Sequence, residues 1–387
     1  AIYWTDQTSW SNENTLNYKK RLGRSHNLDL MAGLSLQGQK NTYDGVASTQ
    51  ITSEELGIAG IHTGNYQKVQ SNYYDWRMMS AFLRANYNFR YKYYLTFSFR
   101  ADGSSKFPSD NRWGYFPAAA LAWRVSEEKF FEGMNSWWND LKFRVSYGEV
   151  GNDGISASLW SQDWTSENDT RWQAALNGVY QPSYDLASTT MANPDLKWET
   201  TITRNVGIDF GFLQNRFTAT IDAYWNTTKD LLMLTQLPGI TGFTSTYANI
   251  GQTSNKGIEI SLRGTIFQNR DWSITAGANI NFNRNKVDKL SDGVTGTYGT
   301  HWIAGSNPDN DYLLKVGKPV GQVFGFIYDG FYTADDFNIT GEGLNRQYEL
   351  KPGVVSGLSS GVRPGDIKYK DLNGDGKIDS NDQMEDV

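Results

Sequence analysis

The chain has 387 residues, a formal net charge of −6 and an aromatic content of 14%. It has no cysteine, which excludes disulfides and thiolate metal sites, and its negative charge argues against nucleic acid as a partner. The mean hydropathy of −0.57 does not separate soluble from barrel proteins, because barrel strands hide apolar residues in alternation. The sequence contains no apolar run of the length that a membrane-spanning helix needs.

Roughly ten strands are predicted from apolar residues that recur at every second position. The first, from Trp10 to Tyr18, alternates imperfectly, and a basic turn at 19–24 leads to the second, from Leu28 to Leu36. A long polar loop to about Asp75 follows. In most of the later strands polar residues fill the intervening positions, which indicates one wet face and one apolar face. The later apolar rows lie at 79–89, 95–99, 119–125, 141–147, 202–210, 217–225, 258–262 and 272–280.

The connections between these strands alternate in length. Short turns near 90–92, 213–215 and 268–271 alternate with long polar connections such as 102–114 and 151–193. Outer-membrane barrels have short turns at the periplasmic rim and longer loops at the extracellular rim. The sequence therefore predicts an all-β fold, a large antiparallel transmembrane β-barrel in the bacterial outer membrane, in contact with its lipid.

A soluble β-sandwich or a carbohydrate-binding module is the alternative, because its strands also alternate. Aromatic residues near the predicted strand ends fit an interfacial girdle of a barrel, and they fit a sandwich core equally well. The uniform polar face opposite the apolar rows favours the membrane barrel. The aromatic residues concerned are Trp113, Tyr115, Trp137, Trp138, Trp198 and Trp225.

An open sheet of this kind would expose unsatisfied backbone groups to lipid, so the strands must close or be completed by others. The chain starts at Ala1 in a strand-like stretch and has no signal-peptide pattern. We therefore expect an internal piece of a longer protein. Residues 1–290 are predicted to hold the barrel strands with their loops, and residues 291–387 a long extracellular loop region.

A calcium-binding loop is predicted at residues 371–382, where the sequence DLNGDGKIDSND matches the D-x-[DN]-x-[DN]-G pattern. Gly376 permits the sharp turn, and Asp382 stands where a bidentate Glu is usual. The alternative is an Asn/Asp/Gly-rich turn that needs no ion. A bound Ca²⁺ would order the loop. The expected ligands are Asp371, Asn373, Asp375, the carbonyl of Lys377, Asp379 through water, and Asp382.

Binding residues are predicted in the long connection 156–185, whose aromatic side chains could stack on sugar rings or dock a partner protein. The alternative is that they pack on one another and make the loop rigid. The aromatic residues are Trp160, Trp164, Trp172, Tyr180 and Tyr184. Four arginines at the inward-facing, polar positions of the predicted strands are expected to line a wet lumen: Arg84, Arg100, Arg144 and Arg263.

Catalysis finds little support in the residues. His26, His62 and His301 are far apart in the sequence and lack ligand spacing. We find no G-x-S-x-G, P-loop or H-E-x-x-H motif. We therefore predict that the protein is not an enzyme and uses no organic cofactor.

Several longer motifs carry a family resemblance. They are RADGSSKF at 100–107, WGYFPAAALAW at 113–123, LKFRVSYG at 141–148 with Gly151 and Asn152, NPDLKWET at 193–200, NKGIE at 255–259, VGKP at 316–319 and DGF at 329–331. With these motifs in order along nearly its whole length, the chain resembles the SusC/RagA family of TonB-dependent outer-membrane transporters of Bacteroidota.

The resemblance implies part of a 22-stranded barrel with a lumen plug. It also implies TonB-driven import of an oligosaccharide or peptide, with a SusD-like surface lipoprotein as partner. We expect the TonB box, the plug domain and the final strands to lie outside this chain. A passive porin-like channel and an outer-membrane enzyme or adhesin are the alternative functions.

Overall fold

The computed structural model describes residues 1–51, 54–64, 66–134, 137–167, 175–176, 179–181, 183–290, 296–298, 312–356, 361–379 and 382–385. The chain divides into two compact units, Ala1–Arg284 and Asn285–Val387. Within the described residues no helix has the length and apolar character needed to cross a membrane. The assignment of residues 291–387 to an extracellular region stays a prediction.

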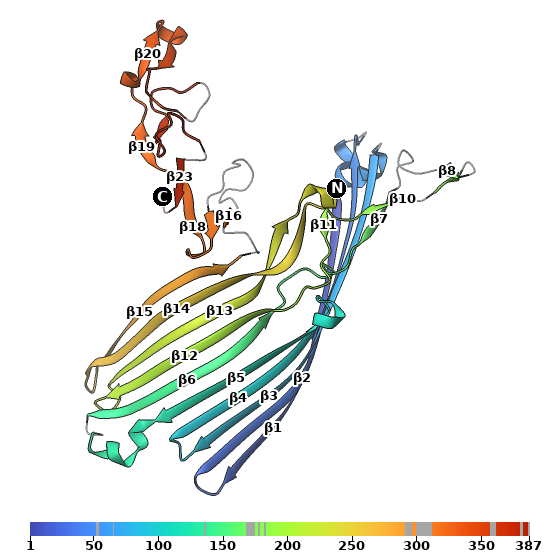
Figure 1. Ribbon diagram of the computed structural model, residues 1–387. Helices are drawn as coiled ribbons and strands as arrows, with labels where there is room; N and C mark the ends of the chain where they lie inside the picture. Colours follow the sequence, from blue (N-terminus) through green and yellow to red (C-terminus); the bar gives the residue numbers. More distant parts are fainter. Residues whose placement is uncertain are drawn as a thin grey trace. The chain divides into compact units, whose positions relative to one another are not determined.

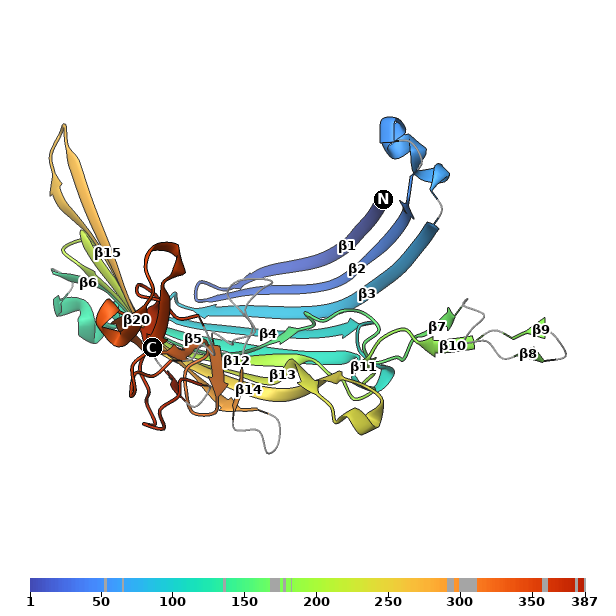
Figure 2. The same ribbon diagram turned by 90° about the horizontal axis from the view of Figure 1, so that it is seen from above.

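The first unit is built on one sheet whose ten long strands pair in chain order (Figures 1 and 2). Every pairing from β1 through β14 is antiparallel, and the short strand β11 (Thr190–Met191) adds to β14 in parallel. The long strands are β1 (Ile2–Leu22), β2 (His26–Thr49), β3 (Tyr66–Phe89), β4 (Tyr93–Ser104), β5 (Trp113–Arg124), β6 (Trp138–Asn152), β12 (Glu199–Phe212), β13 (Phe217–Gln236), β14 (Ser245–Gln268) and β15 (Ser273–Lys289).

The register gives this sheet a polar face and an apolar face, because side chains alternate along each strand and paired residues share a face. On the apolar face Leu83 pairs with Phe99, and Leu121 pairs with Val145. These side chains are exposed in the chain, with Leu121 at 55%. On the polar face Asn86 pairs with Thr96. The predicted all-β barrel-type fold is confirmed, although the described strands do not close into a ring.

Short turns join the strands at one rim of the sheet. Non-glycine residues adopt left-handed backbone there, with φ of 53° at Arg90 and 59° at Gln214. The β5–β6 connection adds the 3₁₀ helices η3 (Val125–Glu127) and η4 (Lys129–Met134). Phe131 on η4 packs with Val125 and Leu141 in a small buried core. This rim corresponds to the predicted short-turn side.

Longer connections lie at the opposite rim. They contain η1 (Glu54–Thr63) after β2, η2 (Ser109–Asn111) after β4, and η5 (Gly239–Thr241) after β13. The β6–β12 connection holds β7 (Trp164–Glu167), β8 (Ala175–Leu176), β9 (Val179–Tyr180), β10 (Ser183–Leu186) and β11. The alternation of short and long connections is as the sequence predicted.

The prediction of a loop up to Asp75 was wrong in its extent. Strand β2 continues to Thr49 and β3 already begins at Tyr66. Beyond Leu36 the apolar-face positions become polar, as at Lys40 and Asp44, so alternation no longer marks the strand. Backbone pairing continues regardless, because ladder hydrogen bonds need no particular side chain.

The second unit consists of short strands around a small core of Tyr332, Phe337 and Val362. A capping box between Thr333 and Asp336 opens its helix η6 (Ala334–Asp336). The unit also contains η7 (Gly343–Asn345). Its strands are β16 (Gly296–Tyr298), β17 (Tyr312–Lys315), β18 (Gln322–Phe326), β19 (Tyr328–Phe331), β20 (Phe337–Thr340), β21 (Gln347–Leu350), β22 (Ile367–Tyr369) and β23 (Gln383–Glu385).

Candidate functional site

A network of ion pairs crosses the polar face over three strands. The Arg144 guanidinium on β6 donates to both carboxylate oxygens of Asp209 at 2.9 Å and to Asp222 on β13 at 3.1 Å. Gly207 of β12 lies between Arg144 and Asp222 in the register. A Cβ at Gly207 would come within 2.7 Å of the Arg144 side chain. The glycine therefore leaves the room in which the guanidinium reaches across β12.

A second charged group lies on β3 and β4. Arg100 donates to Asp102 at 2.7 and 2.8 Å and to the Ser80 hydroxyl at 2.9 Å. Its guanidinium also stands 5.7 Å from the centre of the Phe82 ring. The Phe82 ring covers Gly33, where an added Cβ would clash with the ring. Side chains on the polar face are thus held by specific partners.

All four arginines predicted to line a lumen lie on the polar face. Arg84 pairs in register with Ser98, and Arg263 pairs with Thr218. Arg100 and Arg144 belong to the ion pairs described above. The structure brings the four onto one surface, spread over β3, β4, β6 and β14, and does not gather them into one pocket.

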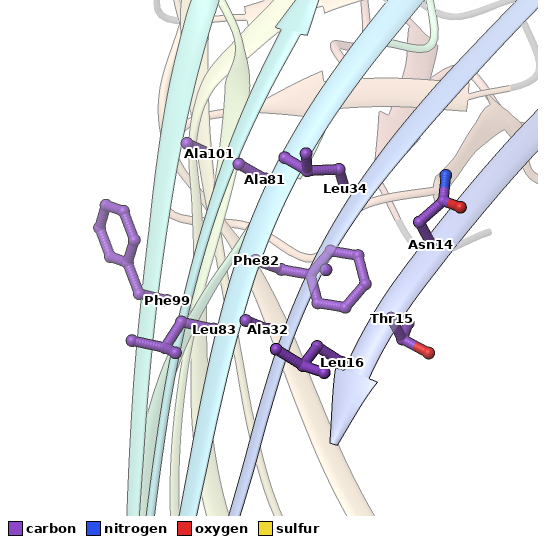
Figure 3. A pocket seen from close by; sticks show the side chains of 11 residues that line it. Asn14, Thr15, Leu16, Ala32, Leu34, Ala81, Phe82, Leu83, Phe99 and Ala101 are labelled. Atoms are coloured by element: carbon purple, nitrogen blue, oxygen red, sulfur yellow. The ribbon is translucent and has the colours of Figure 1, made fainter. Parts of the chain in front are cut away.

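A hollow of about 520 Å³ lies on strands β1 to β4 (Figure 3). Its small residues, Ala32, Ala81 and Ala101, lie among the larger Leu34 and Phe99. Among its lining residues only Asn14 and Thr15 have polar side chains. The hollow suits an apolar chain better than a polar substrate.

A buried aromatic cluster lies at the long-connection end of the polar face. It consists of Phe107, Phe116, Leu196 and Trp198. The Trp198 ring lies 5.2 Å from Phe107 and 5.5 Å from Phe116, and its indole N–H donates to the Arg112 carbonyl at 2.9 Å. Contacts between aromatic rings and burial of this kind fix loops that would otherwise be free.

Two asparagines join the β6–β12 connection to strand β14 through hydrogen bonds. The Asn193 amide donates to the Tyr247 carbonyl at 2.8 Å. The Asn249 amide donates to the Lys197 carbonyl at 2.8 Å, and its oxygen accepts from the Lys197 N–H at 3.0 Å. The NPDLKWET motif at 193–200 therefore builds a fixed ledge at this rim.

The predicted aromatic binding residues fall into separate environments. Trp160 packs against the aromatic cluster. Trp164 on β7 and Tyr184 on β10 are 64% and 65% exposed, on two paired strands. Tyr180 lies on β9, and Trp172 lies outside the described residues. Trp160 thus fits the rigid-loop alternative, while Trp164 and Tyr184 remain available to a ligand.

The predicted calcium loop folds as a compact turn. Asp371 accepts hydrogen bonds from the Gly374 and Gly376 N–H groups at 2.7 and 2.9 Å, and Gly376 has φ of 82°. Asp382 is fully buried and accepts from the Leu372 and Asp379 N–H groups, both at 2.8 Å. The Asp379 N–H, together with the N–H groups of Leu372 and Asn373, holds the pKa of Asp382 below its ordinary value, although burial opposes this shift.

Asn373 and Asp375 also accept backbone hydrogen bonds within this loop, from Asp375 and Lys377 at 2.8 and 2.9 Å. Among the described residues no three His, Asp or Glu side chains are grouped to hold a metal ion. His26 hydrogen-bonds the Tyr87 hydroxyl at 2.7 Å, and His62 contacts the Ala59 carbonyl at 2.9 Å. His301 lies outside the described residues.

Long antiparallel strands with one polar and one apolar face, joined by short turns at one rim, define the wall of an outer-membrane β-barrel. Residues 2–381 match the family described as TonB dependent receptor-like, beta-barrel. The chain belongs to this family, which consists of outer-membrane β-barrel transporters.

Named relatives agree with this family. The chain is 30% identical over 385 residues to TonB-dependent receptor P3 of Formosa agariphila, covering 98% of this chain and 36% of that protein. It is 32% identical over 307 residues to TonB-dependent receptor SusC of Bacteroides thetaiotaomicron, covering 79% and 28%. The chain therefore spans about a third of the length of such relatives.

The structure of the RagAB peptide importer in its closed-closed state matches with a TM-score of 0.73 and 26% identity, over 99% of this chain and 38% of that one. The predicted resemblance to SusC and RagA is confirmed, and so is the outer-membrane location. The apolar face is accordingly the lipid side of a barrel wall, and the polar face is its lumen side.

Proposed function

We propose that the whole protein imports a nutrient, an oligosaccharide or a peptide, across the outer membrane, driven by TonB. The supporting observation is the family match over residues 2–381 together with similarity to SusC and to a peptide importer. A SusD-like surface lipoprotein is the proposed partner. The fixed ledge around Asn193 and Asn249 gives the rim a stable surface that this lipoprotein could contact.

Within the lumen, the Arg144–Asp209–Asp222 network gives the wall a fixed pattern of charge. An ion pair whose two charges already contact each other costs little free energy when it lies next to water. Its carboxylate oxygens keep lone pairs that can accept further hydrogen bonds. We propose that this wall faces the plug and the passing substrate. Catalysis has no part in this scheme, and its absence stays a prediction.

The test uses the full-length protein in its native membrane. Uptake of labelled oligosaccharides and peptides is measured with and without TonB, and co-purifying proteins are identified by mass spectrometry. Loss of uptake without TonB, and a SusD-like lipoprotein in the complex, are expected. Uptake that persists without TonB would favour a passive channel. Surface binding or hydrolysis without uptake would favour an adhesin or an enzyme.

We also propose that loop 371–382 binds Ca²⁺, although its carboxylates are not grouped around a metal position in the described residues and would have to move together on binding. Support comes from the oxygen-ligand spacing, from the φ of 82° at Gly376 and from the buried Asp382, which stays ionised at neutral pH. A carboxylate that accepts amide hydrogen bonds keeps further lone pairs for a cation. Asp371, Asn373, Asp375, the Lys377 carbonyl, Asp379 through water, and Asp382 would hold the ion.

Calcium titration of the full-length protein by calorimetry tests this proposal. We expect a Kd on the order of 10⁻⁴ to 10⁻³ M, as in extracellular modules. Asp375→Ala should weaken binding about tenfold or more, while Asp335→Asn on η6 should not change it. Heat that is unchanged by Asp375→Ala, or no binding at about 10⁻² M Ca²⁺, would mean that the loop is a turn without an ion.

A further inference from the structure

Two cations share one row of paired residues on the apolar face, where charges are least expected. A single row of paired residues crosses β6, β12, β13 and β14 on that face: Tyr147, Arg204, Trp225 and Lys256. Arg204 and Lys256 are both exposed. A cation at the lipid side of a barrel costs free energy that falls from the bilayer midplane toward the interface.

The position of this row on its strands places it at one boundary of the apolar band. Two residues nearer the short turns, the same face carries Val145, Val206, Ala223 and Ile258. Two residues nearer the long connections, it carries Glu149, Ile202, Thr227 and Ser254. The long connections lie at the extracellular rim. The row therefore lies at the outer-leaflet interface, where Trp and Tyr are also favoured.

Neither cation has a carboxylate partner in the described part of the chain, where no acidic oxygen lies within 4.0 Å of Arg204 or Lys256. Within the described residues the Arg204 guanidinium donates a long hydrogen bond of 3.5 Å to the Thr227 hydroxyl. Glu149, the carboxylate on the same face nearby, accepts the hydroxyl hydrogen of Tyr147. Both cations are thus open to an anion from the membrane.

Arg77, also on the apolar-face parity, shows the contrast. Its guanidinium forms an ion pair with Asp75 on the same strand at 3.4 Å. An arginine with its own carboxylate needs no external anion. This difference makes Arg77 a matched control for Arg204.

The separation of the two cations suits one head group. Arg204 and Lys256 are two strand spacings apart, about 10 Å between backbones, and both side chains are long enough to converge. Phosphate accepts hydrogen bonds from Arg and Lys together. The Trp225 indole between them and the neighbouring Ile258 offer an apolar surface to an acyl chain.

We propose that Arg204 and Lys256 clamp a phosphate group of a phosphorylated lipid in the outer leaflet, with Trp225 packed against the lipid. The charge complementarity of two unpartnered cations at the edge of an apolar face carries the assignment. The site lies on the outside of the barrel wall, so it is independent of what the lumen transports.

Native mass spectrometry of the full-length protein in detergent, titrated with diphosphoryl lipid A, tests the clamp. A juxtamembrane cation contributes on the order of 1 kcal/mol, or about fivefold in affinity. Arg204→Gln and Lys256→Gln should each weaken binding about fivefold and the double variant about 25-fold. Arg204→Lys should keep most of the affinity, which separates loss of charge from misfolding.

Two controls complete the design. Arg77→Gln should leave lipid binding unchanged, and dephosphorylated lipid A should bind the native protein as weakly as diphosphoryl lipid A binds the double variant. The proposal is overturned if the double variant binds like the native protein, or if the dephosphorylated lipid binds equally well. The proposal is also overturned if inorganic phosphate displaces the lipid when both are at the same concentration, because the rest of the lipid would then add nothing to the affinity.

Discussion

The polar and apolar faces of the sheet alternate along the same strands, yet their side chains are held in different ways. On the polar face Arg144 donates hydrogen bonds to two carboxylates, and the absence of a Cβ at Gly207 leaves room for its side chain. On the apolar face Leu121 and Val145 stay exposed. Lipid accepts any apolar side chain, whereas a wet lumen with partly buried ion pairs does not. On the apolar face, the size and charge of the new side chain should therefore decide whether a substitution is tolerated. On the polar face, the decisive factor should be whether the side chain keeps its hydrogen-bonding partner.

The largest difference is expected between two leucines. Leu196→Ala opens a cavity in the aromatic cluster, where Leu196 is fully buried, and should destabilise the protein by about 3 to 4 kcal/mol. Leu262→Ala on the apolar face loses only the transfer term, about 1.5 kcal/mol, because lipid fills the space. Urea unfolding of the reconstituted protein measures both. Equal losses would mean that the two faces do not differ in packing.

An introduced positive charge should destabilise the protein strongly on the apolar face and only slightly on the polar face. Ile260 and Ser261 are neighbours on β14 and lie on opposite faces. Ile260→Arg is expected to cost about 3 kcal/mol near the bilayer midplane, while Ser261→Arg in the lumen should cost less than about 1 kcal/mol. Folding yield and thermal unfolding in liposomes compare the pair. A larger loss for Ser261→Arg would reverse the assignment of the faces.

The ion-pair network sharpens the comparison further. Asp209→Asn weakens two hydrogen bonds from Arg144 in a partly buried setting, so a loss of about 2 kcal/mol is expected. The Arg77–Asp75 pair gives the control, because its Arg77 side chain is 76% exposed, so Asp75→Asn should cost less than about 0.5 kcal/mol. The free energy of unfolding of both variants is the readout. Similar values for the two would show that the network behaves like an ordinary surface pair.

The smallest effect concerns Glu128, which lies at the short-turn rim. The Tyr93 hydroxyl, Lys92 and the Trp123 indole donate to its carboxylate and lower its pKa. Its contribution is complete above the ordinary glutamate pKa and is lost as pH falls through the lowered value. Glu128→Gln should lower the Tm by about 2 °C at neutral pH, a difference that shrinks as the pH falls through the lowered pKa of Glu128. Glu127→Gln is the control, and a pH-independent difference would contradict this account.

Much of the barrel wall could be predicted from the residues. The rows Leu28 to Leu36 and Ile258 to Leu262 fix both strand and face, because a period of two survives only in a strand with two different environments. The candidate site could be predicted in part. The parity of Arg100 and Arg144 gave their face, while the partners Asp102, Asp209 and Asp222 could not be read from spacing.

The sequence by itself therefore determined the strands, their faces, the alternating turns and the family, since each depends on local period or on contiguous motifs. Only the tertiary structure decided where β2 ends and β3 begins, which residues form the aromatic cluster, and that Arg204 and Lys256 stand in one row. Those features depend on the register between strands that are distant in sequence. Register is set by the apolar patterns of both paired strands together with the turn that joins them, so no single segment encodes it.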